Sequence, residues 1–181
     1  MTPKFKPVSA SRIEISELML PSHSNFSGKI HGGFILSLLD QIAFACASKH
    51  CGSYCVTASV DTVDFLKPIE IGELVTMKAS VNFVGNTSIV IGIRVEAENI
   101  QTGVVKHCNS SYFTMVAKDS EGKSVKVPGL ILESENDIKR FFKSIKRMQL
   151  RKERTAYANQ LDYTVNQLVH ELEGYNVQID I

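Results

Sequence analysis

The chain has 181 residues, of which 44% are hydrophobic and 22% charged, and its 20 basic and 19 acidic residues leave a formal net charge of +1. This length favours one domain with an appendage, and the composition is typical of a globular protein, which excludes a chain that is disordered throughout. The balanced charge gives no overall basicity that would favour nucleic acid as a partner.

The longest apolar run, Gly32–Ala47, is interrupted by Ser37, Asp40 and Gln41. It is shorter than the ~20 residues that span a bilayer, so we expect no transmembrane helix and no stable membrane insertion. Residues 1–8 carry two lysines with no apolar segment behind them, which is not the pattern of a secretory signal. We therefore expect a cytoplasmic protein whose four cysteines are reduced.

The first predicted strand covers Arg12–Leu20, where apolar and polar residues alternate before Pro21. A loop rich in turn-forming residues follows, and residues 34–49 then contain neither glycine nor proline, which predicts a helix. Apolar side chains cover nearly the whole circumference of this helix. We therefore expect it to be buried on most sides.

Period-two patterning predicts four further strands, Val56–Leu66, Leu74–Val84, Ser88–Ala97 and Val104–Lys118. The turns that connect the last three strands are short. A strand, a helix and then four strands joined in this way indicate an α+β fold, in which a curved antiparallel sheet wraps one long apolar helix.

Residues 1–130 are expected to form this domain, and residues 131–181 a helical C-terminal extension. Apolar residues recur there at helical spacing in two sets, which predicts one broken or two consecutive amphipathic helices: Ile138, Phe141, Phe142, Ile145 and Met148, then Leu161, Val165, Leu168 and Leu172. Residues 135–154 carry eight basic and three acidic side chains. This basic cluster suits the phosphates of a ligand, nucleic acid or an anionic surface, but we favour the solvated face of a helix.

Asp40 is a carboxylate in the middle of the most apolar helix. Burial of an unpaired charge costs several kcal/mol, so one interpretation is a catalytic carboxylate in a dry cleft. The alternative is an exposed polar stripe, because Ser37, Gln41 and Phe44 lie within three or four residues of it. The residues alone leave both open.

Two further segments carry candidate groups. His31-Gly32-Gly33 precedes the helix, where free backbone N–H groups and the helix dipole favour a carbonyl oxygen or oxyanion, although paired glycines are common in turns. Asn25 could orient a water or a substrate amide, although loop asparagines usually form turns. His50, Cys51 and Cys55 lack the spacing of a zinc site, and we expect no metal. The sequence has neither a Gly-x-Ser-x-Gly motif nor a P-loop.

Several features occur together in one order: Asn25-Phe-Ser-Gly-Lys-Ile-His-Gly-Gly33, Asp40, Val56-Thr-Ala-Ser-Val-Asp61 with Phe65-Leu-Lys-Pro68, Gly85-Asn-Thr-Ser88, and Tyr112-Phe-Thr114. In this combination the sequence resembles the hot-dog acyl-CoA thioesterases over about residues 10–130. The resemblance is to the cytosolic long-chain and broad-range acyl-CoA hydrolase branch. It implies the hot-dog fold, and homodimers that often assemble into trimers of dimers.

The resemblance also implies roles for particular residues. Asp40 matches the catalytic carboxylate, acting as general base or nucleophile, and Asn25 matches the catalytic asparagine, which reaches the site from the opposite subunit. The backbone N–H of Gly33, with Gly32 and the adjoining His31, would hold the carbonyl oxygen. The coenzyme A part of the substrate would lie along three residues, Asn86, Thr87 and Ser88. No separate cofactor is implied.

The resemblance leaves two points open. Relatives often have another residue in place of His31, so it implies no proton-transfer role there, and the extension beyond about residue 130 lies outside the family core. Two alternative functions remain: a hydratase or dehydratase of the same fold, for which only His31 and Asp40 are candidate groups, and an acyl-CoA-binding or adaptor module. Acyl chain-length preference is not encoded in any motif.

Overall fold

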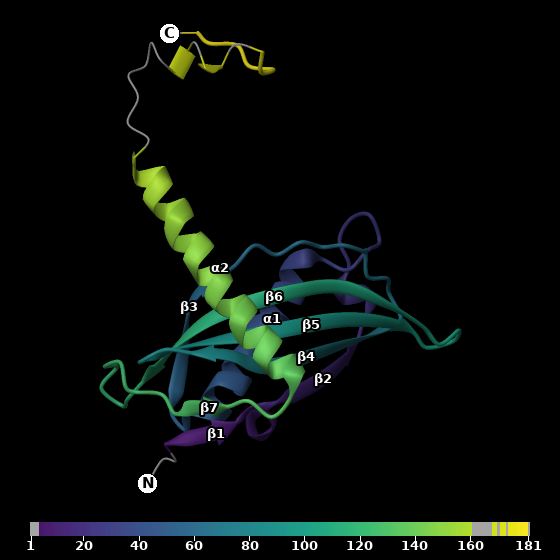
Figure 1. The fold of residues 1–181 in the computed structure, drawn as a ribbon. Helices are drawn as coiled ribbons and strands as arrows, with labels where there is room; N and C mark the ends of the chain where they lie inside the picture. The colour runs from purple at the N-terminus through teal and green to yellow at the C-terminus, as the bar shows by residue number, and fades with distance from the viewer. Residues whose placement is uncertain (1–3, 161–167, 170, 173, 181) are drawn as a thin grey trace. The chain divides into compact units, whose positions relative to one another are not determined.

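The structure is a computed structural model that describes all residues except 1–3, 161–167, 170, 173 and 181. The chain forms two compact units, residues 1–144 and residues 145–181. Its helices and strands are, in order, β1 (Phe5–Pro7), the 3₁₀ turn η1 (Val8–Ser11), β2 (Ile13–Leu18), the 3₁₀ turn η2 (Pro21–His23), α1 (Gly32–Cys51), β3 (Tyr54–Val60), β4 (Glu73–Val84), β5 (Ser88–Asn99), β6 (Val104–Lys118), β7 (Gly129–Ile131) and α2 (Glu135–Gln160). Figure 1 shows their arrangement.

A five-stranded antiparallel sheet in the order β2-β4-β5-β6-β3 forms the body of the first unit, with α1 packed against one face (Figure 1). The alternation on β4 and β5 directs one set of apolar side chains toward α1, and Val75, Met77, Ile91 and Val95 are fully buried there. The predicted α+β architecture is therefore confirmed. Because β3 is an edge strand, one side of its backbone has no partner strand among the described residues.

The helix α1 is less enclosed than its sequence predicts. Ile35, Leu39, Ile42 and other residues on one side are buried, but a stripe on the other side stays exposed, consisting of Leu36, Ser37, Asp40, Gln41 and Phe44. The expectation of a helix buried on most sides is wrong for the single chain. The sheet curves around one side of α1 only, so the apolar side chains on its other side have no sheet packed against them.

The predicted strand Val56–Leu66 is too long. Pairing of β3 with β6 shifts register between Thr57 and Ser59 and ends at Val60. Beyond that point the chain follows β6 through separate hydrogen bonds, including Leu66 N to Cys108 O at 2.9 Å. The Asn109 side chain adds a bond to the carbonyl of Asp64 at 2.9 Å. This segment is therefore fixed without continuing the ladder.

A second small sheet, which no local pattern predicts, forms where β1 pairs in parallel with β7. Gly129 is required there because a Cβ at this position would lie 2.3 Å from the Phe5 ring. The segment after residue 126 thus returns to the N-terminus rather than simply ending the compact unit. Three-residue strands are too short to produce a visible alternation.

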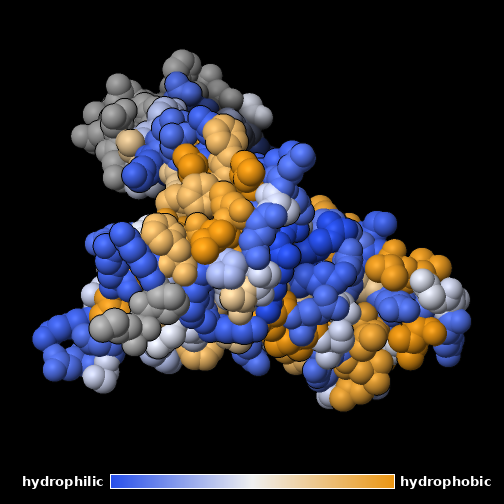
Figure 2. Space-filling model, turned by 60° about the horizontal axis from the view of Figure 1, so that its bottom comes forward, coloured by the Kyte–Doolittle hydropathy of each residue, from blue (hydrophilic) through white to orange (hydrophobic). Residues whose placement is uncertain are grey.

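The helix α2 begins in the first unit, where Asp137 is buried and accepts a hydrogen bond from Arg12 at 2.7 Å. Phe141 packs against Phe83 of β4, with ring centroids 5.1 Å apart. Figure 2 shows apolar side chains gathered along α2 beside hydrophilic ones, as the predicted amphipathic pattern requires. Of the second predicted apolar set, Leu161 and Val165 lie outside the described residues, whereas Leu168 and Leu172 are described and exposed. No helix among the described residues is long and apolar enough to cross a membrane.

Candidate active site

Asp40 lies on the exposed stripe of α1, opposite Thr57 on β3. The Thr57 hydroxyl donates a hydrogen bond to Asp40 Oδ1 over 2.5 Å, and Thr57 Oγ1 also lies 3.3 Å from Met115 Sδ. A carboxylate has two acceptor oxygens, and no second donor to Asp40 comes from the described residues. The arrangement therefore orients the carboxylate and leaves one oxygen open.

The sequence analysis did not single out Thr57. It stands in a strand with a second hydroxyl residue, Ser59, and alternation alone cannot say which of the two faces α1 at Asp40. The register shift between these two residues decides it. Because such a shift depends on pairing with β6, no local sequence signal could have revealed the contact.

A hollow of about 560 Å³ opens beside Asp40, between α1 and the edge strand β3. Apolar side chains form most of its wall, and Phe44 packs against Tyr54 with ring centroids 5.4 Å apart. Its lining residues are Asp40, Gln41, Phe44, Tyr54, Cys55, Val56, Thr57 and Met115. This hollow places a carboxylate at the mouth of an apolar space, which suits a ligand with a polar reacting group and an apolar portion.

The N-terminus of α1 offers one free amide. His31 is the N-cap residue, and its Nδ1 accepts a hydrogen bond from the Gly33 N–H at 2.9 Å. The Gly32 N–H has no partner among the described residues. Gly33, which the resemblance makes the principal donor, is therefore occupied in this structure, and Gly32 is the amide that is available to an incoming oxygen.

Gly32 also lies directly under an aromatic ring. A Cβ at position 32 would come within 3.3 Å of the Phe65 ring. Phe65 belongs to the segment that Asn109 and Cys108 fix along β6, as described above. The absence of a side chain at Gly32 therefore permits close approach of this ring to the start of α1.

Asn25 closes a tight turn before α1. Its Oδ1 accepts hydrogen bonds from Ser27 N at 3.0 Å, Ser27 Oγ at 2.7 Å and Lys29 N at 3.2 Å. The turn-forming interpretation of Asn25 is confirmed by these contacts. The side-chain NH₂ group of Asn25 makes no hydrogen bond within the described residues, and Asn25 does not line the hollow beside Asp40.

Asn86, Thr87 and Ser88 form the turn between β4 and β5. The carbonyl of Thr87 accepts from Ala117 N at 3.0 Å, and that of Asn86 from Val127 N at 3.0 Å. Ser88 of β5 and Val56 of β3 both pair with Val116 of β6. The two residues therefore lie two strands, or about 10 Å, apart in the same cross-strand row. The turn thus lies at the same end of the sheet as Thr57, outside the hollow.

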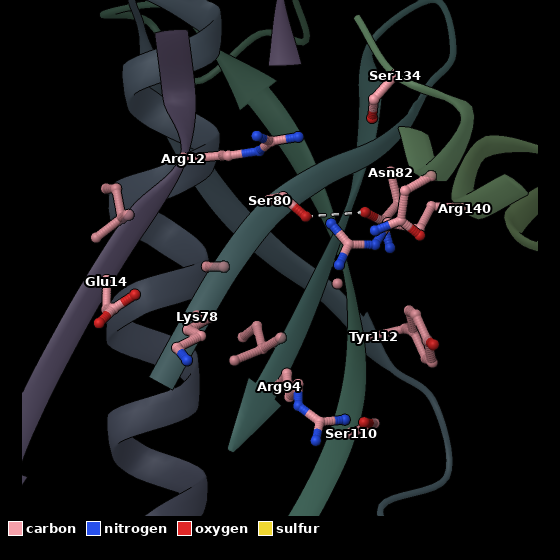
Figure 3. A pocket seen from close by; sticks show the side chains of 15 residues that line it. Arg12, Glu14, Lys78, Ser80, Asn82, Arg94, Ser110, Tyr112, Ser134 and Arg140 are labelled. Carbon is pink, nitrogen blue, oxygen red and sulfur yellow. Dashed lines mark hydrogen bonds between the residues drawn. The ribbon is translucent and has the colours of Figure 1, made fainter. Parts of the chain in front are cut away.

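A second, larger hollow of about 630 Å³ lies on the opposite face of the sheet, beneath the start of α2 (Figure 3). Its floor includes Ser80, whose hydroxyl donates to Asn82 Oδ1 at 3.1 Å. Two of its cationic groups, Lys78 and Arg94, are each 2.8 Å from Glu96. This hollow is larger than the one beside Asp40, but it lies on the face of the sheet opposite α1 and Asp40, which makes it a poor candidate for the reacting site.

His50, one of the residues weighed for a metal, and Cys46 on the same helix both make structural contacts. The two ring nitrogens of His50 lie 3.1 Å from Ser11 Oγ and 3.2 Å from Pro128 O, and burial lowers the pKa of His50. Burial also raises the pKa of the Cys46 thiol to about 12, and its Sγ donates to Ser11 O. These groups hold α1 to η1 and to the segment before β7, and a thiol with so high a pKa is a poor nucleophile.

Comparisons with known proteins agree on one family. Residues 27–104 match the thioesterase superfamily. Protein VdlD of Helicobacter pylori is 42% identical over 141 residues, which are 78% of this chain and 80% of that protein. A Bacillus subtilis protein named as an uncharacterized acyl-CoA thioester hydrolase is 34% identical over 160 residues, 88% of this chain and 93% of that protein. The chain spans only 38% of the human cytosolic acyl coenzyme A thioester hydrolase, with 34% identity.

Solved structures give the same result. An acyl-CoA hydrolase of Staphylococcus aureus, in complex with butyryl coenzyme A, coenzyme A and coenzyme A disulfide, superposes with a TM-score of 0.79 at 31% identity and covers 86% of this chain and 95% of that one. A hexameric acyl-CoA thioesterase without ligand superposes with a TM-score of 0.82 at 35% identity, covering 84% and 98%. The hot-dog fold is confirmed.

Variants of the Staphylococcus aureus hydrolase have also been solved, in which alanine replaces an asparagine, an aspartate or a threonine. In that protein the asparagine precedes the aspartate by 15 positions, and the threonine follows the aspartate by 17.

Proposed function

Because this chain belongs to the thioesterase superfamily, we propose that it hydrolyses acyl-CoA thioesters to a carboxylic acid and coenzyme A at a site built around Asp40. The observation that carries the proposal is the Asp40 carboxylate, oriented by Thr57 at the mouth of an apolar hollow. Relatives that match along most of their length are named acyl-CoA thioester hydrolases, which supports the same reaction here.

The assignment of residues has independent support from spacing. Asn25, Asp40 and Thr57 are separated by 15 and 17 positions, the same intervals as the three substituted residues of the Staphylococcus aureus hydrolase. Asn25 and Asp40 were chosen from the sequence, and Thr57 from the contact with Asp40. The structural contact and the spacing therefore single out the same threonine.

Asp40 activates the attack on the thioester carbonyl carbon. As a general base it takes a proton from water while the water oxygen bonds to that carbon; as a nucleophile it forms an anhydride that water then cleaves. In either route the C–S bond breaks and coenzyme A leaves as a thiol after taking up a proton. Gly32 and Asp40 of one α1 lie about 12 Å apart along the helix, so the amide that donates to the carbonyl oxygen as it gains negative charge is the Gly32 N–H of the opposite subunit, rather than the occupied Gly33 N–H.

Asn25 positions the water or the substrate carbonyl from the opposite subunit. Its free NH₂ group supplies the donor, while its Oδ1 is used by the turn. Two observations support a shared site: Asn25 does not line the hollow of its own chain, and the outer side of the edge strand β3 beside that hollow has no partner strand in the described part of the chain. Joining β3 edges in a homodimer removes that edge, and the hexameric relatives make a trimer of dimers the natural assembly.

The coenzyme A portion extends past the turn of Asn86, Thr87 and Ser88. This turn lies at the same end of the sheet as Thr57, as the cross-strand row through Val56 and Ser88 shows. Its side-chain hydroxyl and amide groups are donors suited to the pantetheine and phosphate oxygens of the substrate.

The experiment that tests the function is free-thiol release from acyl-CoAs of increasing chain length. Asp40→Asn and Asn25→Ala are each expected to lower kcat/KM at least tenfold, or ~1.4 kcal/mol of transition-state stabilisation. Asn99→Ala is the matched control, because the Asn99 side chain accepts from Gln101 N and Thr102 N in the turn between β5 and β6, much as Asn25 does in its own turn.

The control separates lost turn stability from lost chemistry. Asn99→Ala is expected to keep wild-type turnover, whereas Asn25→Ala loses it. If the wild-type protein binds acyl-CoA in calorimetry but releases no thiol, the acyl-CoA-binding module replaces the hydrolase as the function.

A further inference from the structure

Phe26, the residue next to Asn25, is fully exposed in the single chain. Burying a phenylalanine side chain stabilises a protein by about 1.5–3 kcal/mol, so full exposure forgoes this gain. One exposed apolar residue needs no explanation by itself. Phe26 differs because its backbone is held in one place and because it adjoins a proposed catalytic residue.

The turn that carries Phe26 is fixed at both ends. Gly28 N donates to Asn25 O at 3.0 Å, and Asn25 N donates to Lys29 O at 2.7 Å. Lys29 in turn forms an ion pair with Glu70 at 2.7 Å. Gly28 has a φ of 76°, which closes the turn at a position that glycine tolerates. The structure therefore presents the Phe26 ring outward on a well-braced turn.

The hollow beside Asp40 lacks a wall on its solvent side. Phe44, Tyr54, Val56 and Met115 line the part that the chain itself provides, and Phe44 and Tyr54 are partly exposed at 38% and 62%. A hydrolase that excludes bulk water from this space needs an apolar cover there. The walls described for it come from α1, β3 and, through Met115, β6.

Asn25 and Phe26 have Cα atoms about 3.8 Å apart, so their backbones enter the same region of a partner subunit, and the Phe26 ring is exposed and available for contact there. If Asn25 reaches Asp40 of the second subunit, Phe26 arrives at the same hollow. A two-fold dimer repeats this contact at both sites, because each subunit gives and receives the same patch.

We propose that Phe26 of the partner subunit covers the apolar side of the Asp40 hollow and forms a wall of the acyl-chain site. This proposal deepens the proposed function and rests on it. The occupant of the hollow's open side is thus a second copy of this chain, and Phe26 is a specificity-determining residue. It contacts the acyl chain and takes no part in proton transfer.

The first test uses the fact that the chain contains no tryptophan. Phe26→Trp introduces a single tryptophan, which can be excited apart from the five tyrosines, and Phe142→Trp on α2 is the control at another exposed phenylalanine. Emission from Phe26→Trp is expected to be blue-shifted in the dimer and to shift to the red when dilution produces monomers, as followed by sedimentation. An additional Asp40-hollow change, Tyr54→Ala, should weaken the blue shift, whereas it should leave Phe142→Trp unaffected. Solvent-exposed emission from Phe26→Trp in the dimer would overturn the proposal.

The second test places Phe26 in one subunit and Asp40 in the other. Phe26→Ala is expected to lower kcat/KM for medium-chain acyl-CoA at least about fivefold more than for acetyl-CoA, because the lost contact is to the methylene groups. Phe26→Leu should recover most of the medium-chain rate. Co-expression of Phe26→Ala with the inactive Asp40→Asn variant produces mixed dimers in which the one active site receives an intact Phe26.

Mixed dimers are expected to recover the wild-type chain-length profile. If they keep the profile of Phe26→Ala, or if Phe26→Ala lowers all chain lengths equally, the specificity role is wrong. Failure of the proposed function gives a different result, since the wild type would then cleave no acyl-CoA while the fluorescence of Phe26→Trp would still report whether the ring enters the partner.

Discussion

Thr57 Oγ1 on β3 donates a hydrogen bond of 2.5 Å to Asp40 Oδ1 on α1, so that the sheet edge and the central helix are joined at the proposed reacting carboxylate. Burial does not hold this carboxylate, because Asp40 is exposed in the single chain. Its orientation therefore depends on one hydroxyl, and the residue lines the hollow with its second oxygen left without a donor from the described residues.

The contact predicts a specific loss of activity. Thr57→Val keeps the shape of the side chain and removes the donor, so kcat/KM for acyl-CoA is expected to fall about tenfold or more, whereas Thr57→Ser retains most of the rate. Free-thiol release measures both variants. If Thr57→Ser loses activity while Thr57→Val keeps it, the methyl group, and not the hydrogen bond to Asp40, matters at this position.

The N-terminus of α1 gives a second prediction, in which a substitution at His31 lowers the free energy of unfolding without raising kcat/KM. His31→Ala removes the acceptor for the Gly33 N–H and is expected to lower the free energy of unfolding by about 1 kcal/mol, as for other N-cap losses. His31→Asn, which can cap, should restore most of it. Urea unfolding measures the change.

The same variants distinguish the two glycine amides. If Gly32 is the donor to the substrate carbonyl, freeing the Gly33 N–H in His31→Ala gives no gain in kcat/KM. A higher kcat/KM in His31→Ala than in the wild type would instead assign the carbonyl to Gly33, with His31 as its competitor.

His50 gives a pH-dependent prediction for stability. Burial lowers its pKa in the folded state below the ordinary value of 6.5, so the unfolded chain takes up the proton first as pH falls. The neutral, buried His50 makes its full contribution to the free energy of unfolding above pH 6.5. That contribution is lost as the pH falls below 6.5 toward the lowered pKa. Unfolding free energies at successive pH values should therefore decrease through this window.

The control for that window is His50→Asn, which cannot titrate there. Its stability at neutral pH is lower, since the contacts to Ser11 and Pro128 are altered, but its decline between neutral and mildly acidic pH should be smaller than that of the wild type. An identical decline in both proteins would assign the pH dependence to other groups.

Local pattern was sufficient for the element types and for most of their bounds. The period of two in β4 and in β5 predicted strands that the structure extends by only a residue or two, because each has one face against the core and one toward solvent. The absence of glycine and proline after residue 33 predicted α1. An ordered set of short motifs indicated the family, and with it Asp40 and Asn25 as site residues.

Pairing between distant segments decided the rest. The register shift at Thr57, the small sheet of β1 and β7, and the ring of Phe65 over Gly32 all depend on which residues meet across the fold, and no local window contains both partners. The exposed stripe on α1 was also missed for this reason. Its apolar side chains have the composition of a core, and only the curvature of the sheet decides which side of the helix is left uncovered. Sequence alone thus determined the chemistry that this chain carries, and tertiary structure determined that Thr57 orients Asp40, that Gly32 keeps a free amide and that Phe26 faces outward.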